Sequence, residues 1–298
     1  MHLDEVDVDA SLVRRLLATQ FPQWADRPVE KVSSSGTDNA IYRLGDDMAV
    51  RLPRIQGATG QVVKEQRWLP RLAPYLPLAI PAPLAMGTPA EGYPWHWSVY
   101  QWLEGDDATV ERITDLRQAA RELASFVTAL QRIDPTGGPP PGKHNSFRGV
   151  PLGMRDAETL RAIEALRGIL DASEVAAAWE TTLRAPEWER PPVWVHGDFL
   201  PTNFLVERGA LGAVIDFGCL GVGDPACDLL VAWALFSGES RDVFHSAVQA
   251  DDATWARGRG WALSFGLIAL LYYQKTNPGL AGIARHTIDE VLADHIKP

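Results

Sequence analysis

Two carboxylates and one amide stand at the ends of short apolar stretches, where chain folding alone does not require them. Asp198 and Asn203 lie on the segment His-Gly-Asp-Phe-Leu-Pro-Thr-Asn, and Asp216 follows the apolar run Ala-Val-Ile. Carboxylate and amide oxygens are hard ligands, which suit Mg²⁺ better than zinc. A carboxylate base beside a magnesium site is what the transfer of a phosphoryl group requires.

The elements around these residues predict how they could meet. Val193–Val195 is expected to form a buried strand that ends in a loop. Phe204–Val206 and Ala213–Ile215 are apolar runs joined by Glu-Arg-Gly-Ala, which predicts an antiparallel hairpin. Such a hairpin brings the start of its first strand beside the end of its second, so Asn203 and Asp216 should lie together. Turn capping is the alternative for any one of these polar residues, but it does not account for the compound pattern.

The remaining chain divides into a strand-rich part and a helical part. Stretches that predict strands are Ile41–Leu44, Met48–Leu52 and Trp97–Leu103, and stretches that predict helices are 11–20, Gln61–Leu72, Asp115–Ile133 and Asp224–Phe236. This order indicates an α+β fold with a boundary near residue 103. We expect residues 1–103 to form a β-rich lobe and residues 104–298 to form a mainly helical lobe.

Composition excludes several classes of function. The formal net charge of −10 disfavours nucleic acid as a partner, because phosphate binding needs a basic surface. The most apolar run, Trp261–Tyr273, is too short to cross a bilayer and predicts a buried helix. Two cysteines imply no disulfide framework, and the acidic first residues do not form a signal peptide. A cytoplasmic protein without membrane contact is therefore expected.

Three motifs resemble the signatures of the aminoglycoside phosphotransferase family, which are small-molecule relatives of the protein kinases. They are the run at 196–203, Val-Ile-Asp-Phe-Gly at 214–218 and Gly-Asp-Pro-Ala-Cys-Asp at 223–228. The resemblance spans the chain from about Val32 to the C-terminal helices. It implies a protein-kinase-like two-lobe fold, Mg²⁺ with ATP or GTP as phosphoryl donor, and a small hydroxylated, cationic acceptor such as an aminoglycoside, with antibiotic resistance as the associated role.

The resemblance also implies roles for residues of the second lobe. Asp198 would accept the proton of the acceptor hydroxyl or orient that hydroxyl, as the catalytic residue. Asn203 and Asp216 would hold the metal ion. His196 is expected to be structural, with a general base as the less favoured reading.

Two further aspartates are expected to support this loop. Asp224 should cap a helix that starts at Pro225. Asp228 sits among apolar residues, and the resemblance implies that it holds backbone N–H groups of the catalytic loop from below.

The first lobe should bind the nucleotide. Arg51 occupies the strand position of the phosphate-binding lysine in kinases, and an arginine there keeps the charge but changes the geometry. Glu65 is a lone acid on the apolar stripe of its helix, so an ion pair with Arg51 is expected; a partly exposed boundary residue is the alternative.

A small-residue loop and the hinge between the two lobes, expected near Gln101–Gly105, complete the predicted nucleotide site. Ser35 and Gly36 lie in Ser-Ser-Ser-Gly-Thr-Asp-Asn, whose backbone N–H groups could approach phosphates. The carbonyl of Gln101 and the N–H of Leu103 should bind the edge of the base, which does not distinguish ATP from GTP.

Departures from the protein kinases argue against a protein substrate. Gly197 and Leu200 replace an arginine and a lysine of the kinase pattern, and the stretch from Asp216 to Asp224 is too short for a regulatory activation segment. A housekeeping kinase of an amino alcohol, sugar or macrolide-like compound is the alternative function, and a nucleotide-binding pseudokinase is a further one. The irregular segment at 134–153 is either functional or a surface linker.

Overall fold

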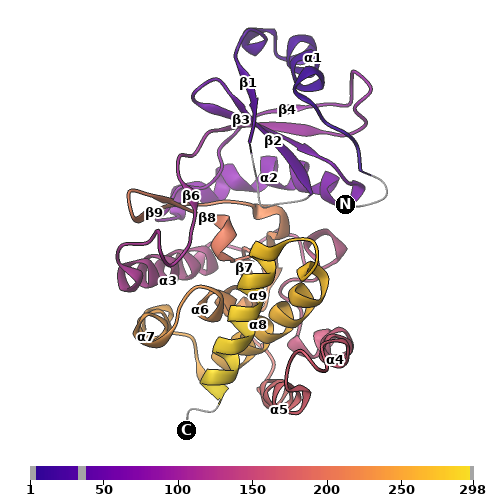
Figure 1. The fold of residues 1–298 in the computed structure, drawn as a ribbon. Coiled ribbons are helices and arrows are strands. Elements are labelled where there is room, and N and C mark those ends of the chain that lie inside the picture. The colour runs from indigo at the N-terminus through magenta and orange to yellow at the C-terminus, as the bar shows by residue number, and fades with distance from the viewer. Residues whose placement is uncertain (1–4, 33–37, 296–298) are drawn as a thin grey trace.

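The computed structural model describes residues 5–32 and 38–295, and it places a β-sheet above a mainly helical part (Figure 1). The sheet is antiparallel throughout, with the strand order β1-β2-β3-β5-β4. Its strands are β1 (Val29–Lys31), β2 (Asn39–Leu44), β3 (Met48–Pro53), β4 (Pro83–Gly87) and β5 (Trp97–Gln101). The strands predicted at Ile41–Leu44 and Met48–Leu52 are confirmed as β2 and β3, which pair as an antiparallel hairpin.

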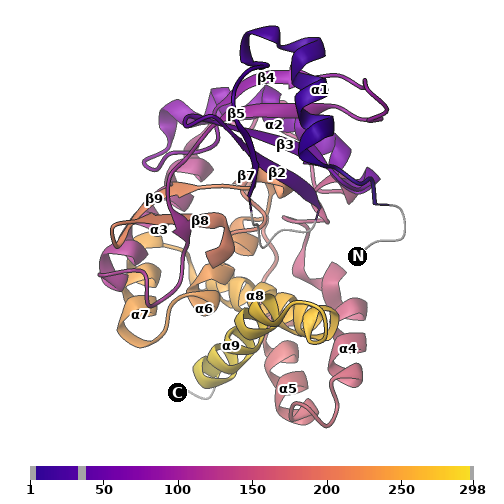
Figure 2. The same cartoon turned by 45° about the horizontal axis from the view of Figure 1, so that its top comes forward.

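Alternation along β3 decides which side chains face the helical part. Met48, Val50 and Leu52 are buried on one face of the sheet, in a hydrophobic cluster with α1 (Ala10–Gln20). Because successive side chains of a strand point to opposite faces, Arg51 projects from the other face. The second helix of this part, α2 (Thr59–Leu72), lies against that other face (Figure 2).

The helical part contains two small sheets and most of the helices. Its helices are α3 (Leu116–Arg132), α4 (Asp156–Ala165), α5 (Ala172–Leu183), α6 (Val231–Ala234), α7 (Gly238–Val248), α8 (Asp252–Tyr273) and α9 (Pro278–His295). The small sheets pair β7 (Val193–Val195) with β10 (Gly221–Gly223), and β8 (Phe204–Glu207) with β9 (Ala210–Val214) and β6 (Asp106–Asp107). These elements confirm the α+β fold class. Within the described residues, none of the helices has both the length and the apolar character that a membrane span requires.

The hairpin of β8 and β9 is present, but its turn is shorter than predicted. Arg208 and Gly209 form the turn with φ angles of 52° and 86°, and the second strand begins at Ala210 rather than Ala213. Two consecutive residues with positive φ make the tight turn that matches strand twist in a two-residue hairpin. Phe204 pairs with Val214, so the start of β8 lies beside the end of β9, as expected.

The predicted helix from Asp224 to Phe236 is wrong as a single α-helix. Residues Pro225–Leu230 form a 3₁₀ helix, and only α6 continues it in α-helical form. The Asp224 side chain caps the first turn by accepting from the N–H of Ala226. Tighter i to i+3 winding is common at helix N-termini, and Pro225 has no N–H to donate.

Candidate active site

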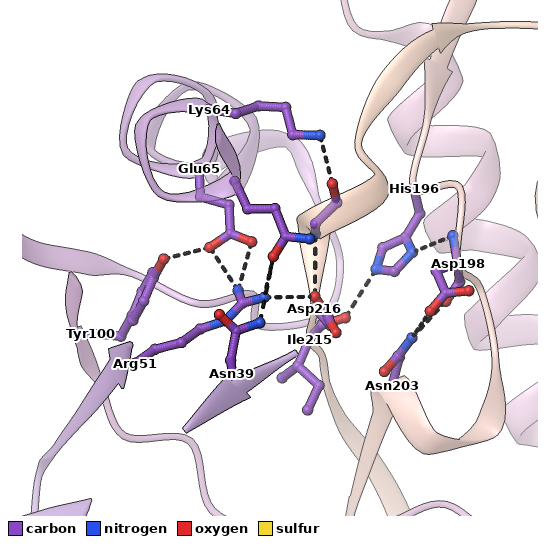
Figure 3. A network of polar contacts seen from close by, with 12 residues as sticks. Asn39, Arg51, Lys64, Glu65, Tyr100, His196, Asp198, Asn203, Ile215 and Asp216 are labelled. Atoms are coloured by element: carbon purple, nitrogen blue, oxygen red, sulfur yellow. Dashed lines mark hydrogen bonds and ion pairs between the residues drawn. The ribbon is translucent and has the colours of Figure 1, made fainter. Parts of the chain in front are cut away.

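Asp198, Asn203 and Asp216 line one cleft of about 1040 Å³ between the sheet and the helical part. The Nδ2 of Asn203 donates to the Asp198 side chain at 2.9 Å and to its backbone carbonyl at 2.8 Å (Figure 3). The N–H of Ile215 donates to the Asn203 carbonyl at 2.8 Å, which brings Asp216 to the same end of the hairpin. The structure thus brings together the three residues that the sequence singled out.

The loop that carries Asp198 is held from beneath by Asp228. Both oxygens of this buried carboxylate accept backbone hydrogen bonds, from the N–H of His196 and the N–H of Gly197, each at 2.7 Å. Gly197 has a φ of +83°, and a Cβ there would lie 2.5 Å from the carbonyl oxygen of Cys219. These two hydrogen bonds are the support that was predicted for Asp228. The backbone at position 197 requires glycine, because its φ is positive and a side chain would meet Cys219.

His196 ties this loop to the residue before Asp216. Its Nε2–H donates to the Ile215 carbonyl at 3.0 Å, and its Nδ1 accepts from the Asp198 N–H at 3.2 Å (Figure 3). A carbonyl can only accept and a backbone N–H can only donate, so these two bonds select the neutral ring with its proton on Nε2. Burial lowers the pKa of His196, which agrees with a structural role.

The two carboxylates of the cleft have pKa values displaced in opposite directions. Desolvation raises the pKa of Asp198, and the guanidinium of Arg148 opposes this rise. Desolvation would raise the pKa of Asp216 as well, but the Arg51 guanidinium and the Gly218 N–H lower it. At neutral pH Asp216 is a carboxylate beside a cation, and Asp198 is the more basic of the two.

The residues present fit a magnesium ion. Among the described residues, both side-chain hydrogen bonds of Asn203 use Nδ2, which leaves its Oδ1 available as a ligand. Asp216 uses Oδ1 to accept from Arg51 and Gly218, which leaves its Oδ2. Residues 5–32 and 38–295 contain no group of three or more His, Cys, Asp or Glu side chains that could hold a metal alone. Mg²⁺ suits such a sparse site, because nucleotide phosphates and water complete its coordination.

Arg51 and Glu65 form the predicted ion pair. The Nη1 of Arg51 lies 2.7 Å and 2.9 Å from the two oxygens of Glu65, whose side chain is only 2% exposed. The hydroxyl of Tyr100 also donates to Glu65. The Nη2 of Arg51 donates to Gln61 at 2.9 Å and to Asp216 at 3.0 Å, so one guanidinium joins the sheet, α2 and the hairpin (Figure 3). The contact with Asp216 was not predicted.

The other predicted residues are placed as follows. Gln101 and Leu103 both line the cleft, and the Leu103 N–H has no hydrogen-bond partner in the described part of the chain. Ser35 and Gly36 lie outside the described residues. Asp224 caps the 3₁₀ helix and pairs with Arg257, with 2.8 Å between Oδ2 and Nε, which is a structural arrangement away from the metal ligands.

Arg148 is a residue of the cleft that sequence reasoning missed. Its Nη2 lies 3.7 Å from Oδ1 of Asp198 and is carried there by the irregular segment at 134–153. That segment is docked by backbone bonds: the carbonyl of Pro139 accepts from Val222, and that of Gly149 accepts from Asp224, both at 2.9 Å. The unusual length of the segment was the one sequence signal for such a role.

Lys64 makes a second unpredicted contact, between α2 and the segment that follows β9. Its Nζ donates to the carbonyl of Gly218 at 2.6 Å (Figure 3). The bond attaches α2 two residues beyond Asp216, so α2 and the proposed metal-binding segment should move together.

Comparison with known proteins supports this architecture. The family profile described as "Phosphotransferase enzyme family" matches residues 30–261. The GDP complex of wild-type aminoglycoside 2'-phosphotransferase-IIIa superposes with a TM-score of 0.73 at 20% identity, covering 97% of this chain and 100% of that chain. The streptomycin–ATP–APH(2")-IIa ternary complex gives a TM-score of 0.61 at 19% identity, covering 97% of both chains.

A macrolide phosphotransferase is also similar. Macrolide 2'-phosphotransferase MphH from Brachybacterium faecium gives a TM-score of 0.61 at 22% identity and covers 97% of this chain and 99% of that chain. No curated protein sequence matches this chain. At these identities the structural likeness establishes the fold, and it leaves the acceptor open between the two kinds of antibiotic and other small molecules.

Proposed function

The chain belongs to the phosphotransferase enzyme family and is a small-molecule kinase, and we propose that it transfers the γ-phosphoryl group of Mg²⁺-bound ATP or GTP to a hydroxyl group. The observation that carries this proposal is the convergence of Asp198, Asn203 and Asp216 in one cleft, with Asn203 hydrogen-bonded to Asp198. In this arrangement Asp198 would act as the base, and Asn203 and Asp216 would hold the metal ion. A pseudokinase would not need to keep all three groups.

Asp198 would act on the acceptor hydroxyl. As the hydroxyl oxygen bonds to the γ-phosphorus, the bond from that phosphorus to the bridging oxygen of the nucleoside diphosphate breaks. The hydroxyl proton passes to Asp198, whose raised pKa makes it a better proton acceptor than an ordinary aspartate. The hydrogen bond from Asn203 fixes the direction of this carboxylate.

Asn203 and Asp216 would hold the magnesium ion through Oδ1 and Oδ2, respectively. When bound, the ion neutralises charge on the phosphate oxygens. Arg51 would contribute its guanidinium to the same phosphates, and its present bonds to Glu65 and Asp216 place it at the metal-binding end of the cleft.

The nucleotide base would lie against the hinge. The N–H of Leu103, which has no hydrogen-bond partner among the described residues, and the carbonyl of Gln101 would offer a donor and an acceptor at the edge of the cleft. Such backbone contacts suit adenine and guanine alike, so both ATP and GTP remain donors in this proposal. Ser35 and Gly36 would cover the phosphates.

For the acceptor, a metabolite-like or macrolide-like compound is favoured over an aminoglycoside. Solved structures similar to this chain contain kanamycin, gentamicin or streptomycin, which are polycations, and Asp38, Asp106 and Asp107 of this cleft could attract such a ligand. The wall of the cleft formed by α8 and α9 offers Phe265, Ile268, Tyr272 and Tyr273 instead. An antibiotic-resistance role would follow only if an antibiotic fits this wall.

The test is turnover of the Asp198→Ala variant. Formation of nucleoside diphosphate is measured with Mg²⁺ and a panel of hydroxyl compounds that includes kanamycin, erythromycin, sugars and hydroxy acids. Loss of the base should lower turnover by about 10²–10⁴-fold, while thermal-shift titration with Mg²⁺ and a non-hydrolysable ATP analogue shows unchanged binding. Native turnover by Asp198→Ala would overturn the proposed mechanism.

A further inference from the structure

Two arginines line the cleft beside its apolar wall. Arg148 comes from the segment at 134–153, and Arg155 lies at the end of the 3₁₀ turn before α4. Each side chain is 12% exposed. Their guanidinium carbons lie 5.7 Å and 5.4 Å from the ring of Trp261, which is fully buried beneath them. Two like charges therefore lie near one indole, each in cation–π contact with it.

Neither arginine of this pair has a close, buried carboxylate of its own among the described residues. In the described part of the chain, the Arg148 guanidinium has one ion-pair partner, Asp198 at 3.7 Å, and its Nε makes no hydrogen bond. Asp198 is also the proposed proton acceptor, so it is not a dedicated counterion. Arg155 pairs with the half-exposed Glu158 at 3.2 Å, and its Nε donates to Ser264 at 3.3 Å.

The electrostatic cost of the pair is visible in Arg155. Burial, followed by repulsion from Arg148, lowers the pKa of Arg155 to about 10. An anion bound by both guanidiniums would offset the repulsion between them. Its charged hydrogen bonds would also compensate for the water that the two arginines lose on burial. A polycation in the same place would add to the repulsion.

The remaining lining residues define what else the ligand must carry. Phe265, Ile268, Tyr272 and Tyr273 of α8 form an apolar and aromatic surface with Leu280 of α9; α8 and α9 pack side by side below the sheet (Figure 2). Asp38, which directly precedes β2, also lines the cleft, and after burial its charge contributes to the raised pKa of Tyr273. Such a surface suits an apolar body, and the arginines lie at its border with Asp198.

We infer that the acceptor is a hydroxylated compound with an apolar body and an anionic group, carboxylate or phosphate, which Arg148 and Arg155 hold while its hydroxyl reaches Asp198. This inference rests on the proposed function, because it assigns the acceptor end of the same cleft. Arg155 is a specificity-determining residue in this arrangement. Arg148 both binds the anion and adjusts the basicity of Asp198.

Four probes that share one benzene ring separate the contribution of charge to binding from that of the apolar ring. Phenylacetate and phenyl phosphate are anionic, benzyl alcohol is neutral and benzylamine is cationic. Their dissociation constants are measured by NMR titration of the full chain with Mg²⁺ and a non-hydrolysable ATP analogue. At least one anion should bind about tenfold or more tightly than benzyl alcohol, because charged hydrogen bonds are the stronger ones. The better of the two anions identifies carboxylate or phosphate.

Variants locate the anion site. Arg155→Met should abolish the advantage of the anions over benzyl alcohol, and Arg155→Lys should retain part of it, which also controls for loss of folding. Arg112→Met is the matched control, because Arg112 lines the cleft but donates to the carbonyl of Asp107 near the hinge. This control should leave the binding of the anions unchanged.

Three outcomes would overturn the inference: benzylamine binding as tightly as the anions, no probe binding better than benzyl alcohol, or Arg155→Met weakening the nucleotide analogue instead of the probes. The titration needs no phosphoryl transfer. It can therefore fail while Asp198→Ala confirms the proposed function, and it can succeed if that function is wrong.

Discussion

Asp198 is poised between opposing influences at the scale of single residues. Desolvation and the neighbouring charge of Asp216 raise its pKa, while Arg148 and the Asn203 hydrogen bond lower it. A base is most effective when its pKa lies near the working pH. Arg148 lowers the pKa of Asp198 and so keeps this proposed base ionised at a lower pH than it would be without that cation.

The pH dependence of kcat/KM follows from this balance. Asp198 must be ionised to accept a proton, so activity falls as pH falls through its pKa in the free enzyme. Arg148→Met removes a cation that lowers this pKa, and we expect the acidic limb of the profile to move to higher pH. The pH–rate profiles of Arg148→Met and of the control Arg112→Met are compared with the wild type. A limb that stays in place or moves to lower pH in Arg148→Met contradicts the assignment.

At the scale of elements, the 3₁₀ helix at Pro225–Leu230 supports the loop that carries Asp198. Asp228→Ala would leave the N–H groups of His196 and Gly197 buried without acceptors, and each such loss costs about 1–3 kcal/mol. We expect the free energy of unfolding to fall by about 2–4 kcal/mol, measured by urea denaturation. Asp228→Asn keeps one acceptor oxygen and should lose clearly less. Equal losses in the two variants would refute this account of the loop.

A second link between elements runs from β3 to α2 through Arg51 and Glu65. Removal of one partner from a buried pair leaves an uncompensated charge and costs about 3–5 kcal/mol. We therefore expect Arg51→Met and Glu65→Gln to be strongly non-additive in a double-mutant cycle of unfolding free energies.

The exposed pair Arg43–Glu104, at 2.8 Å, is the matched control for that cycle. Its side chains are 34% and 59% exposed, so solvent screening should hold its coupling to about 0–1 kcal/mol. A coupling of Arg51 with Glu65 as small as that of the control would show that the pair does not join β3 to α2.

At the scale of the whole molecule, the cleft lies where the sheet meets the helical part. Trp68, Leu69 and Leu72 of α2 and Tyr100 of β5 belong to the same hydrophobic cluster as the core of the helical part. We propose a boundary between the two lobes near residue 103, with α2 as the element that packs across it. A ligand bound in the cleft should therefore stabilise the molecule as a unit.

Nucleotide binding should raise the stability of the chain. A non-hydrolysable ATP analogue at a hundred times its dissociation constant stabilises a protein by about 2.7 kcal/mol if it binds only the folded state. We expect Mg²⁺ to increase the thermal shift at a fixed concentration of the analogue, and Asp216→Asn to remove most of this increase. EDTA provides the Mg²⁺-free reference. An undiminished Mg²⁺ effect in Asp216→Asn would exclude Asp216 as a metal ligand.

The sequence by itself determined the features that depend on neighbours along the chain. Two apolar runs joined by a short turn segment predicted the hairpin that places Asn203 beside Asp216. The helical stripe of Glu65 predicted its ion pair with Arg51, because both belong to regular elements whose facing sides are set by their periodicity. The resemblance of the motifs at 196–203 and 223–228 to a known family suggested Asp198 as the base and Asp228 as its support.

Only the tertiary structure decided the contacts between distant segments. Arg51 meets Asp216 across 165 positions, and Arg148 reaches Asp198 from an irregular segment. Neither contact leaves a periodic trace, because it depends on how rigid elements pack against each other and not on local propensity. For the same reason the arginine pair over Trp261, on which the proposed anionic acceptor rests, could be recognised only in the folded chain.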